Sequence, residues 1–224
     1  MSFSRSLKAR AAKVWEEGYN HPFVQELGQG TLDREKFRFY LLQDYLYLLQ
    51  YSKVFASAAI KSDTEELMTR FSKIQYFILA NEMDLHRSYM AEFGIKPEEV
   101  IDVKSSLYNK TYTANMLAHA QTGGLAELLA TVFPCAWTYS DWGKRLKEQY
   151  ADRLEGNFYK SWIEKYASKE FEDSFEWFYD TLDALTANMT DRQRDKIADI
   201  FISSVEFEYL FWDMAYKQQM SYSG

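Results

Sequence analysis

Residues 33–55 read DREKFRFYLLQDYLYLLQYSKVF, and this stretch decides the fold class. An α-helix turns by about 100° per residue, so residues three, four and seven positions apart share a face. That spacing puts seven large apolar and aromatic side chains on one face: Phe37, Tyr40, Leu41, Tyr47, Leu48, Tyr51 and Phe55. Asp33 precedes them, in the position of a helix N-cap. We therefore expect a long helix from Asp33 to about Ile60, with one face in the core.

A carboxylate, Asp44, lies in the middle of this apolar face. Burying a charge among rings is costly unless the charge is paired or hydrogen-bonded. Two interpretations are open at this point. Asp44 either bonds a tyrosine or a neighbouring helix end, as a structural residue, or it binds a polar ligand.

The rest of the chain is also predicted to be helical. Nine glycines and three prolines in 224 residues are too few for the many tight turns of a sheet-rich fold. Capping-box patterns at Ser62–Glu65 and Thr190–Gln193 open two further helices. We expect the others at 2–18, from Asn20, from Ser105 or Ser106 to Gly123, on to about Gln149, at 155–166 and from Ser168 to about Ala187, with a short turn at Pro97. These signals predict an all-α fold of eight or more helices in a single domain, residues 1–224.

Composition excludes several classes of function. The net charge of −7 argues against a basic nucleic-acid-binding surface. No apolar run has the length of a membrane span, and the N-terminus lacks the apolar segment of a signal peptide. A single cysteine permits no internal disulfide, which fits a reducing compartment. We expect a cytoplasmic protein that binds neither nucleic acid nor membrane.

The last predicted helix carries a second inward carboxylate. Its apolar face includes Ile197, Phe201 and Trp212, and Glu208 is central to that face. Glu206 is two residues away and so points in roughly the opposite direction. Helical phase therefore selects Glu208 as the buried glutamate. Burial should raise the pKa of such a carboxyl group, which suits a proton donor near neutral pH. A hydrogen-bonded structural carboxylate is the alternative.

The only cysteine, Cys135, follows Pro134 inside a predicted helix and shares a face with Tyr139 and Trp142. Proline inside a helix removes one backbone donor and usually bends the helix. By itself, an inward cysteine is more often a small inert apolar residue than a nucleophile. Neither interpretation is excluded by the spacing.

Metal and nucleotide sites find little support in the sequence. Glu82 and His86 are four residues apart, whereas the di-iron pattern of helical bundles needs Glu and His three apart, in two copies, with two more glutamates. Phosphate-binding and dinucleotide-binding glycine motifs are absent from the sequence. We expect no metal and no cofactor.

Six short blocks in order along nearly the whole chain resemble the TenA family, also called thiaminase II. They are His21-Pro-Phe-Val24, Leu42-Gln-Asp44, Glu82-Met-Asp-Leu-His86, Pro134-Cys135-Ala-Trp137, Trp162-Ile-Glu-Lys-Tyr166 and Glu208-Tyr-Leu-Phe-Trp-Asp-Met-Ala-Tyr216. The resemblance implies a helical fold like that of haem oxygenase, without haem, assembled as a homotetramer. It also implies conversion of 4-amino-5-aminomethyl-2-methylpyrimidine to its hydroxymethyl counterpart, and cleavage of thiamine into pyrimidine and thiazole alcohols.

The same resemblance assigns roles to individual residues. Cys135 matches the nucleophile, and Glu208 matches the glutamate that protonates a ring nitrogen. Asp44 matches the carboxylate that binds the amino group and a ring nitrogen of the pyrimidine. The remaining positions are aromatic: Tyr47 and Tyr139 match residues that sandwich the ring, and Tyr112 and Tyr166 match tyrosines that hold polar groups.

Two other functions compete with this hydrolase. A regulatory protein could bind a thiamine-related pyrimidine tightly without turnover. A metal-dependent oxidase on a similar helical scaffold would use Glu82, His86 and further ligands. The sequence does not decide whether thiamine or its breakdown product is the physiological substrate.

Overall fold

The structure, a computed structural model, describes residues 2–96, 99–100 and 102–221. All regular elements within these ranges are helical, which confirms the predicted all-α class. The predicted turn at Pro97 lies outside the described residues. None of the described helices has the length and hydropathy that crossing a membrane would require.

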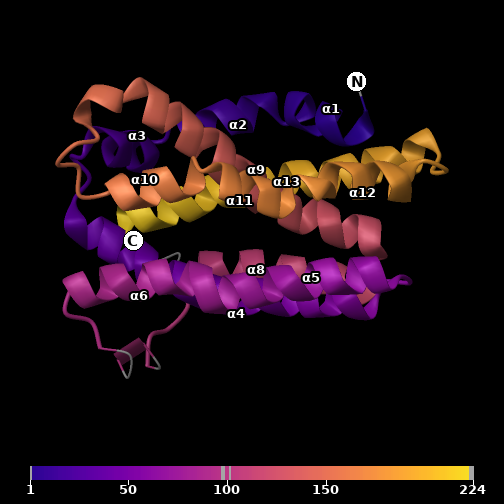
Figure 1. Cartoon of the computed structure of the whole chain (residues 1–224), viewed down its shortest axis with the longest axis horizontal. Helices are drawn as coiled ribbons and strands as arrows, with labels where there is room; N and C mark the ends of the chain where they lie inside the picture. Colours follow the sequence, from indigo (N-terminus) through magenta and orange to yellow (C-terminus); the bar gives the residue numbers. More distant parts are fainter. Residues whose placement is uncertain (1, 97–98, 101, 222–224) are drawn as a thin grey trace. The chain divides into compact units, whose positions relative to one another are not determined.

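Two compact units make up the chain (Figure 1). The first comprises residues 1–32 and 126–213, and the second comprises 33–125 and 214–224. The division falls inside the last helix, after Asp213. The expectation of a single domain over residues 1–224 stays a prediction.

The first unit contains the first three helices of the chain and nearly all of the helical segments from α9 onward. Its helices are α1 (Phe3–Arg10), α2 (Ala12–Tyr19), α3 (Pro22–Gln29), α9 (Leu125–Gln149), α10 (Lys160–Tyr166), α11 (Lys169–Phe175), α12 (Trp177–Thr186) and α13 (Asp191–Lys217), with a 3₁₀ turn at Ala151–Arg153. Helix α1 packs against α12, and α10 packs against α11. Much of the core of this unit consists of rings, for example Trp15, which lies 5.3 Å from Trp137 and 6.5 Å from Phe201 between ring centroids.

The second unit is organised around the stretch that decided the fold class. Asp33 caps α4 (Arg34–Ile60) by accepting a hydrogen bond from the backbone N–H of Glu35. All seven residues of the predicted apolar face are buried. Helix α4 packs against α5 (Glu65–Phe77), α6 (Met83–Glu92) and α8 (Leu107–Thr122). The predicted helix and its core face are therefore confirmed.

Several predicted boundaries are wrong in detail. The helix expected at 2–18 is broken at Ala11, and the one expected from 155 begins at Lys160. Thr64, not Ser62, caps α5: its hydroxyl accepts from the N–H of Leu67, while the Ser62 hydroxyl donates to the carbonyl of Ala58. The helix expected from Ser168 is interrupted at Glu176, between α11 and α12.

One irregularity had no counterpart in the sequence pattern. Residues Ile78–Glu82 form a π-helical turn, which joins α5 to α6. A π turn inserts one extra residue into a helix and rotates the next helical segment by roughly 100°. Such turns occur often at functional sites. Here the turn sets which side of α6 faces α4.

Candidate functional site

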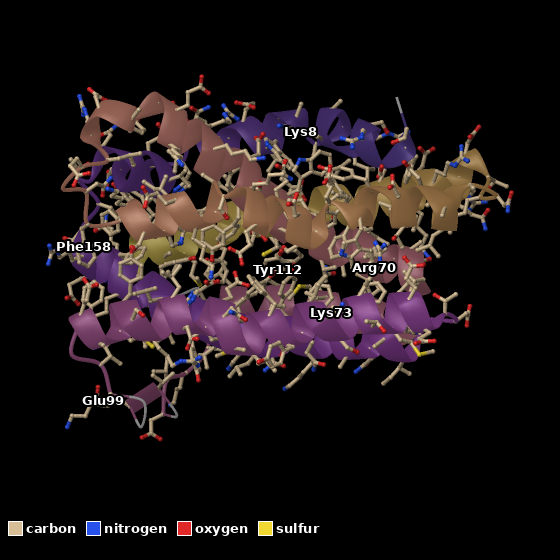
Figure 2. The ribbon with its side chains drawn as sticks, in the orientation of Figure 1. Lys8, Arg70, Lys73, Glu99, Tyr112 and Phe158 are labelled. Carbon is tan, nitrogen blue, oxygen red and sulfur yellow. The ribbon has the colours of Figure 1, made fainter. Side chains whose placement is uncertain are left out.

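The seven residues to which the resemblance assigns roles are divided between the units. Cys135, Tyr139, Tyr166 and Glu208 belong to the first unit, and Asp44, Tyr47 and Tyr112 belong to the second. Figure 2 shows the side chains on the ribbon, with Tyr112 labelled on α8. Each group therefore has its own surroundings within its own unit.

Asp44 is buried on α4, with 3 % of its surface exposed. Its Oδ2 atom accepts a hydrogen bond of 3.0 Å from the hydroxyl of Tyr40, one turn earlier on the same helix. The same oxygen lies 2.5 Å from Nε2 of His86 on α6. A tyrosine partner was one of the two predicted possibilities, whereas His86 was not predicted as a partner.

His86 is fully buried, and each of its ring nitrogens has a partner. Nδ1 lies 3.1 Å from the carbonyl oxygen of Glu82. A carbonyl oxygen only accepts, so Nδ1 must carry a proton. The short contact between Nε2 and Oδ2 of Asp44 then requires a second proton between these two atoms. Together the imidazole and the carboxyl group hold two protons, as an imidazolium–carboxylate pair or its neutral equivalent.

Electrostatics favours the ionic form of this pair. Burial by itself disfavours the imidazolium, but the hydrogen bond and negative charge of Asp44, together with the Glu82 carbonyl, raise the pKa of His86 above its usual value. The signal that could have found this pair was the inward position of both residues. Sequence spacing placed Glu82 and His86 on one helix face but did not identify the helix opposite.

Two tyrosines of the second unit pack together, one on α4 and one on α8. Tyr47 and Tyr112 are buried, and their ring centroids are 5.1 Å apart. Tyr47 also stacks on Tyr51 at 5.3 Å, and its hydroxyl points at the sulfur of Met116, 3.6 Å away. Both predicted aromatic residues of this unit thus lie together in an ordered ring cluster.

The predicted tyrosines of the first unit are also adjacent. Tyr139 on α9 and Tyr166 on α10 are buried, with ring centroids 4.8 Å apart and planes at 68°. Gly143, one turn after Tyr139, allows this approach, because a Cβ there would lie 3.0 Å from the backbone of Tyr166 and Ala167. Trp162 and Trp212 complete the cluster around Tyr139 at 5.6 and 5.3 Å.

Cys135 is half-buried on α9, one turn before Tyr139. Helix α9 continues through Pro134, although proline supplies no backbone donor there. The hydroxyl of Thr138 donates to the carbonyl of Cys135 at 3.3 Å. Structural cysteines are usually fully buried, whereas reactive ones are partly accessible. The exposure of Cys135 is that of an accessible thiol.

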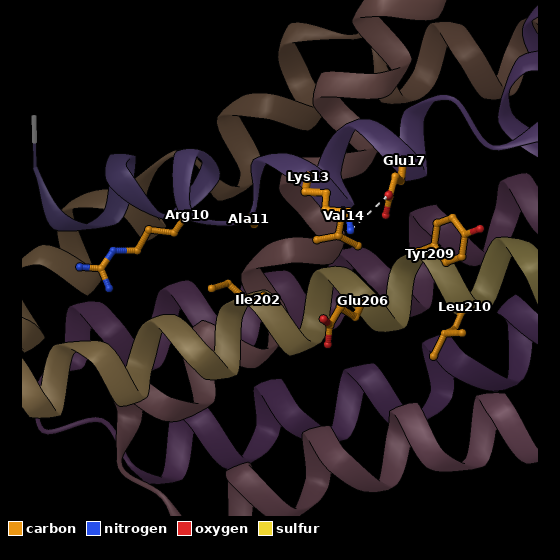
Figure 3. Close-up of a pocket in the computed structure, with 9 residues that line it drawn as sticks. All are labelled: Arg10, Ala11, Lys13, Val14, Glu17, Ile202, Glu206, Tyr209 and Leu210. Atoms are coloured by element: carbon orange, nitrogen blue, oxygen red, sulfur yellow. Dashed lines mark ion pairs between the residues drawn. The ribbon is translucent and has the colours of Figure 1, made fainter.

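Helical phase chose correctly between the two glutamates of α13. Glu208 has 2 % of its surface exposed, whereas Glu206 is exposed. Glu206 lines a pocket of about 460 Å³ between residues of α1, α2 and α13 (Figure 3). Lys13 and Glu17, which also line the pocket, form an ion pair. The predicted residues Cys135, Tyr139, Tyr166 and Glu208 do not line this pocket.

Metal ligands do not gather among the described residues. In those ranges no three His, Cys, Asp or Glu side chains lie close enough together to hold a metal ion. His86, the one histidine that the sequence offered as a ligand, has Asp44 and the Glu82 carbonyl as its partners.

Comparison with known proteins gives relatives over the full length of the chain. The chain is 40 % identical over 225 residues to the aminopyrimidine aminohydrolase of Halalkalibacterium halodurans, covering 100 % of both chains. It is 43 % identical to the aminopyrimidine aminohydrolase of Helicobacter pylori, covering 97 % of this chain and 100 % of the relative.

Solved structures agree with the fold. A TenA homologue from P. horikoshii OT3 superposes with a TM-score of 0.86 at 28 % identity, covering 97 % of this chain and 99 % of the other. A protein from Shewanella denitrificans OS217 with a haem-oxygenase-like fold superposes with a TM-score of 0.75 at 16 % identity, covering 96 % and 92 %. The predicted haem-oxygenase-like fold is thereby confirmed.

The family model described as TENA/THI-4/PQQC matches residues 8–218, which span both units. This match and the relatives at 40 and 43 % identity extend over nearly every described helix. The chain belongs to the TENA/THI-4/PQQC family.

Proposed function

We propose that this protein is an aminopyrimidine aminohydrolase that acts in thiamine metabolism. Its substrate is 4-amino-5-aminomethyl-2-methylpyrimidine, whose exocyclic C–N bond it hydrolyses, and it cleaves thiamine at the same methylene carbon. Full-length identity of 40 and 43 % to two aminopyrimidine aminohydrolases carries the proposal. The half-buried position of the only cysteine supports it, since the reaction needs an accessible thiolate.

The proposed reaction uses Glu208 as the proton donor and Cys135 as the nucleophile. A pyrimidine is a poor electrophile until one of its ring nitrogens is protonated. Glu208, whose carboxyl group is almost completely buried, transfers a proton to a ring nitrogen. The Cys135 thiolate then forms a C–S bond to the activated ring.

The second half of the reaction expels the amine and restores the ring. Electrons of the ring break the exocyclic C–N bond. The substrate's amine, which is protonated as an ammonium group, leaves as ammonia, and when thiamine is the substrate the thiazolium leaves as the neutral thiazole. Water adds at the methylene carbon and loses a proton, which gives the hydroxymethyl group. The C–S bond breaks to regenerate the thiolate, and the ring nitrogen returns its proton to Glu208.

Binding falls to the other predicted residues. Asp44 accepts hydrogen bonds from N–H groups of the pyrimidine edge. Tyr47 and Tyr139 hold the plane of the heterocycle, and Tyr112 and Tyr166 hold polar groups of the substrate or of the attacking water. Aromatic rings around a flat heteroaromatic ligand also exclude bulk water.

Substitution of the nucleophile tests the proposal directly. We expect Cys135→Ala to reduce turnover of the aminopyrimidine by about a thousandfold or more, because covalent catalysis is lost. Product is followed by chromatography of the hydroxymethyl pyrimidine, and thermal unfolding checks that the variant is folded. Unchanged turnover by a folded Cys135→Ala protein would show that the thiol is not the nucleophile.

The two glutamates of α13 provide a matched pair for the proton donor. Glu208→Gln keeps the size of the side chain but removes the acidic proton, so kcat should fall by about 100-fold or more. Glu206→Gln is the same chemical change two residues away on an exposed face, and we expect it to leave kcat within about twofold. Equal losses in both variants would contradict the assignment of the proton to Glu208.

A binding protein without turnover is the second candidate. A solved relative from Silicibacter sp. TM1040, described as a TenA family transcription regulator, favours it, at 30 % identity and a TM-score of 0.86. The net charge of −7 opposes contact with DNA. Tight binding of the pyrimidine by the wild-type protein, with no product formed, would favour this candidate over the hydrolase.

We further propose that the protein is a homotetramer in the cytoplasm, as the family resemblance implies. The second unit exposes large apolar side chains, among them Ile60 at 85 % and Tyr76 at 71 %. Exposed apolar groups of this size are typical of protein interfaces. Light scattering coupled to gel filtration measures the mass in solution, and a monomer would contradict the proposal.

A further inference from the structure

The two oxygens of Asp44 differ in their surroundings. Oδ2 receives both of the protein's donors, the hydroxyl of Tyr40 and Nε2 of His86. Within the described ranges, Oδ1 accepts no hydrogen bond. Asp44 is only 3 % exposed, and Oδ1 is not among the described side-chain atoms that are fully buried without a partner, so this oxygen remains accessible to the N–H group of a ligand.

The contacts of His86 also fix the orientation of its ring. Nδ1 donates to the Glu82 carbonyl at the end of the π-helical turn, so Nε2 must face Asp44. Tyr40 flanks the imidazole at 6.5 Å between ring centroids. The charged groups that face this ring are Asp44 from α4 and Glu82 from the π-helical turn, and Tyr40 is a neutral donor.

We propose that His86 is a positioning residue: it donates to Oδ2 of Asp44 and holds the carboxylate in place, so that Oδ1 is presented to the N–H groups of the aminopyrimidine. The assignment rests on the proposed function, because it supposes that Asp44 binds that edge of the substrate. His86 does not touch the substrate and acts only through Asp44. The π-helical turn has a role in the same arrangement, since it rotates α6 to the phase in which His86 meets α4.

A measurement without substrate tests the first half of the inference. In wild-type protein labelled with ¹⁵N-histidine, His86 should show two protonated ring nitrogens well above pH 6.5, about the usual pKa of histidine. Its signals are assigned by their loss in His86→Gln. Asp44→Asn should bring the titration of His86 to lower pH, because the carboxylate that holds the proton is gone. A neutral His86 at about pH 6, below that usual pKa, and insensitive to Asp44→Asn, would overturn the proposal.

The pH dependence of kcat/KM tests the second half of the inference, that His86 acts through Asp44 on substrate binding. His86→Phe removes both the donor and the charge, and we expect kcat/KM for the aminopyrimidine to fall by about 10- to 100-fold at neutral pH. The acid limb of its pH profile should differ from that of the wild type, since the substrate-binding carboxylate then has no cation beside it. His86→Gln keeps an N–H donor without the charge, and it should recover part of the loss.

The matched control is His119→Gln, on α8 of the same unit, which changes a histidine that the inference does not use. Its pH profile should match that of the wild type. A loss in His86→Phe that leaves the acid limb in place, with no recovery in His86→Gln, would reveal a purely structural role and overturn the proposal.

The two proposals fail in different ways. Absence of turnover by the wild-type protein, with either substrate, would overturn the proposed function whatever the spectra show. Normal turnover together with a His86 that does not respond to Asp44→Asn would overturn only the role of His86. Normal turnover, a responsive His86 and a shifted acid limb would support both.

Discussion

Each unit contains a histidine next to an aspartate, and the two pairs hold their protons in opposite ways. In the first unit, Nε2 of His21 lies 3.6 Å from Oδ1 of Asp213. His21 caps α3, and its Nδ1 accepts a hydrogen bond of 3.1 Å from the N–H of Phe23. A ring nitrogen that accepts carries no proton, so this imidazole is neutral with its proton on Nε2.

In the second unit the backbone group at Nδ1 of the histidine is an acceptor and not a donor. Nδ1 of His86 faces a carbonyl instead of an N–H, so it must donate. The other nitrogen then meets Asp44 at 2.5 Å, and both side chains are almost completely buried, at 1 and 5 % exposure. Asp213 keeps 25 % of its side chain exposed. The backbone atom at Nδ1 decides whether that nitrogen carries a proton, and in the second unit the hydrogen bond and negative charge of Asp44 then favour the ionic form of the pair.

The largest expected difference between the pairs is in catalysis. Asp44→Asn leaves a buried cation without its partner and removes the proposed substrate acceptor, so we expect kcat/KM to fall by about 100- to 1000-fold. Asp213→Asn makes the same chemical change at a partly exposed carboxylate beside a neutral imidazole, and kcat/KM should stay within about threefold of the wild type. Steady-state assays on both variants decide this, with thermal unfolding as the check on folding. Comparable losses would mean that the two pairs are not functionally distinct.

A smaller difference is expected in the pH dependence of stability. The pKa of His86 is raised in the folded protein, because the hydrogen bond and charge of Asp44 outweigh burial. The pair therefore stabilises the fold fully below the unfolded pKa, about 6.5, and this contribution is lost as pH rises through the higher folded pKa. His86→Gln should lower the free energy of unfolding by about 1–3 kcal/mol at about pH 6, and the deficit should shrink toward about pH 9.

Denaturant unfolding of wild type and His86→Gln at several pH values measures that deficit. Asp213→Asn serves as the comparison, because its deficit should not decline through the same window. A His86→Gln deficit that stays constant from about pH 6 to about pH 9 would contradict an ionic pair in the folded protein.

The helix framework could be predicted from the sequence because its signals are local. At Thr190–Gln193 the capping box forms as predicted, with the Thr190 hydroxyl accepting from the N–H of Gln193 and the Gln193 side chain accepting from the N–H of Thr190. At Ser62–Glu65 the same pattern misled, because Thr64 offers a second hydroxyl two residues later and the chain uses that one. Caps involve atoms within a few residues, so local patterns predict them well and fail only where two candidates compete.

The pairing within the candidate site could not be predicted in this way. Helical phase correctly placed Asp44 and Glu208 in the interior. It could not show that Asp44 meets His86, because 42 residues separate them and a π-helical turn between Ile78 and Glu82 shifts the phase of α6. No periodicity rule anticipates a single inserted residue, since its stability depends on tertiary packing.

The smallest expected effect concerns the second donor to Asp44. Tyr40→Phe removes one neutral hydrogen bond of 3.0 Å to Oδ2 but leaves the His86 contact, so kcat/KM should fall only about 2- to 10-fold. Tyr209→Phe is the matched change in the first unit, where the ring lies 5.3 Å from His21, and it should have no measurable effect. A loss in Tyr40→Phe as large as that in His86→Phe would mean that the phenol, not the imidazolium, holds Asp44 in position. In that case the contrast between the two histidines would have no bearing on the reaction.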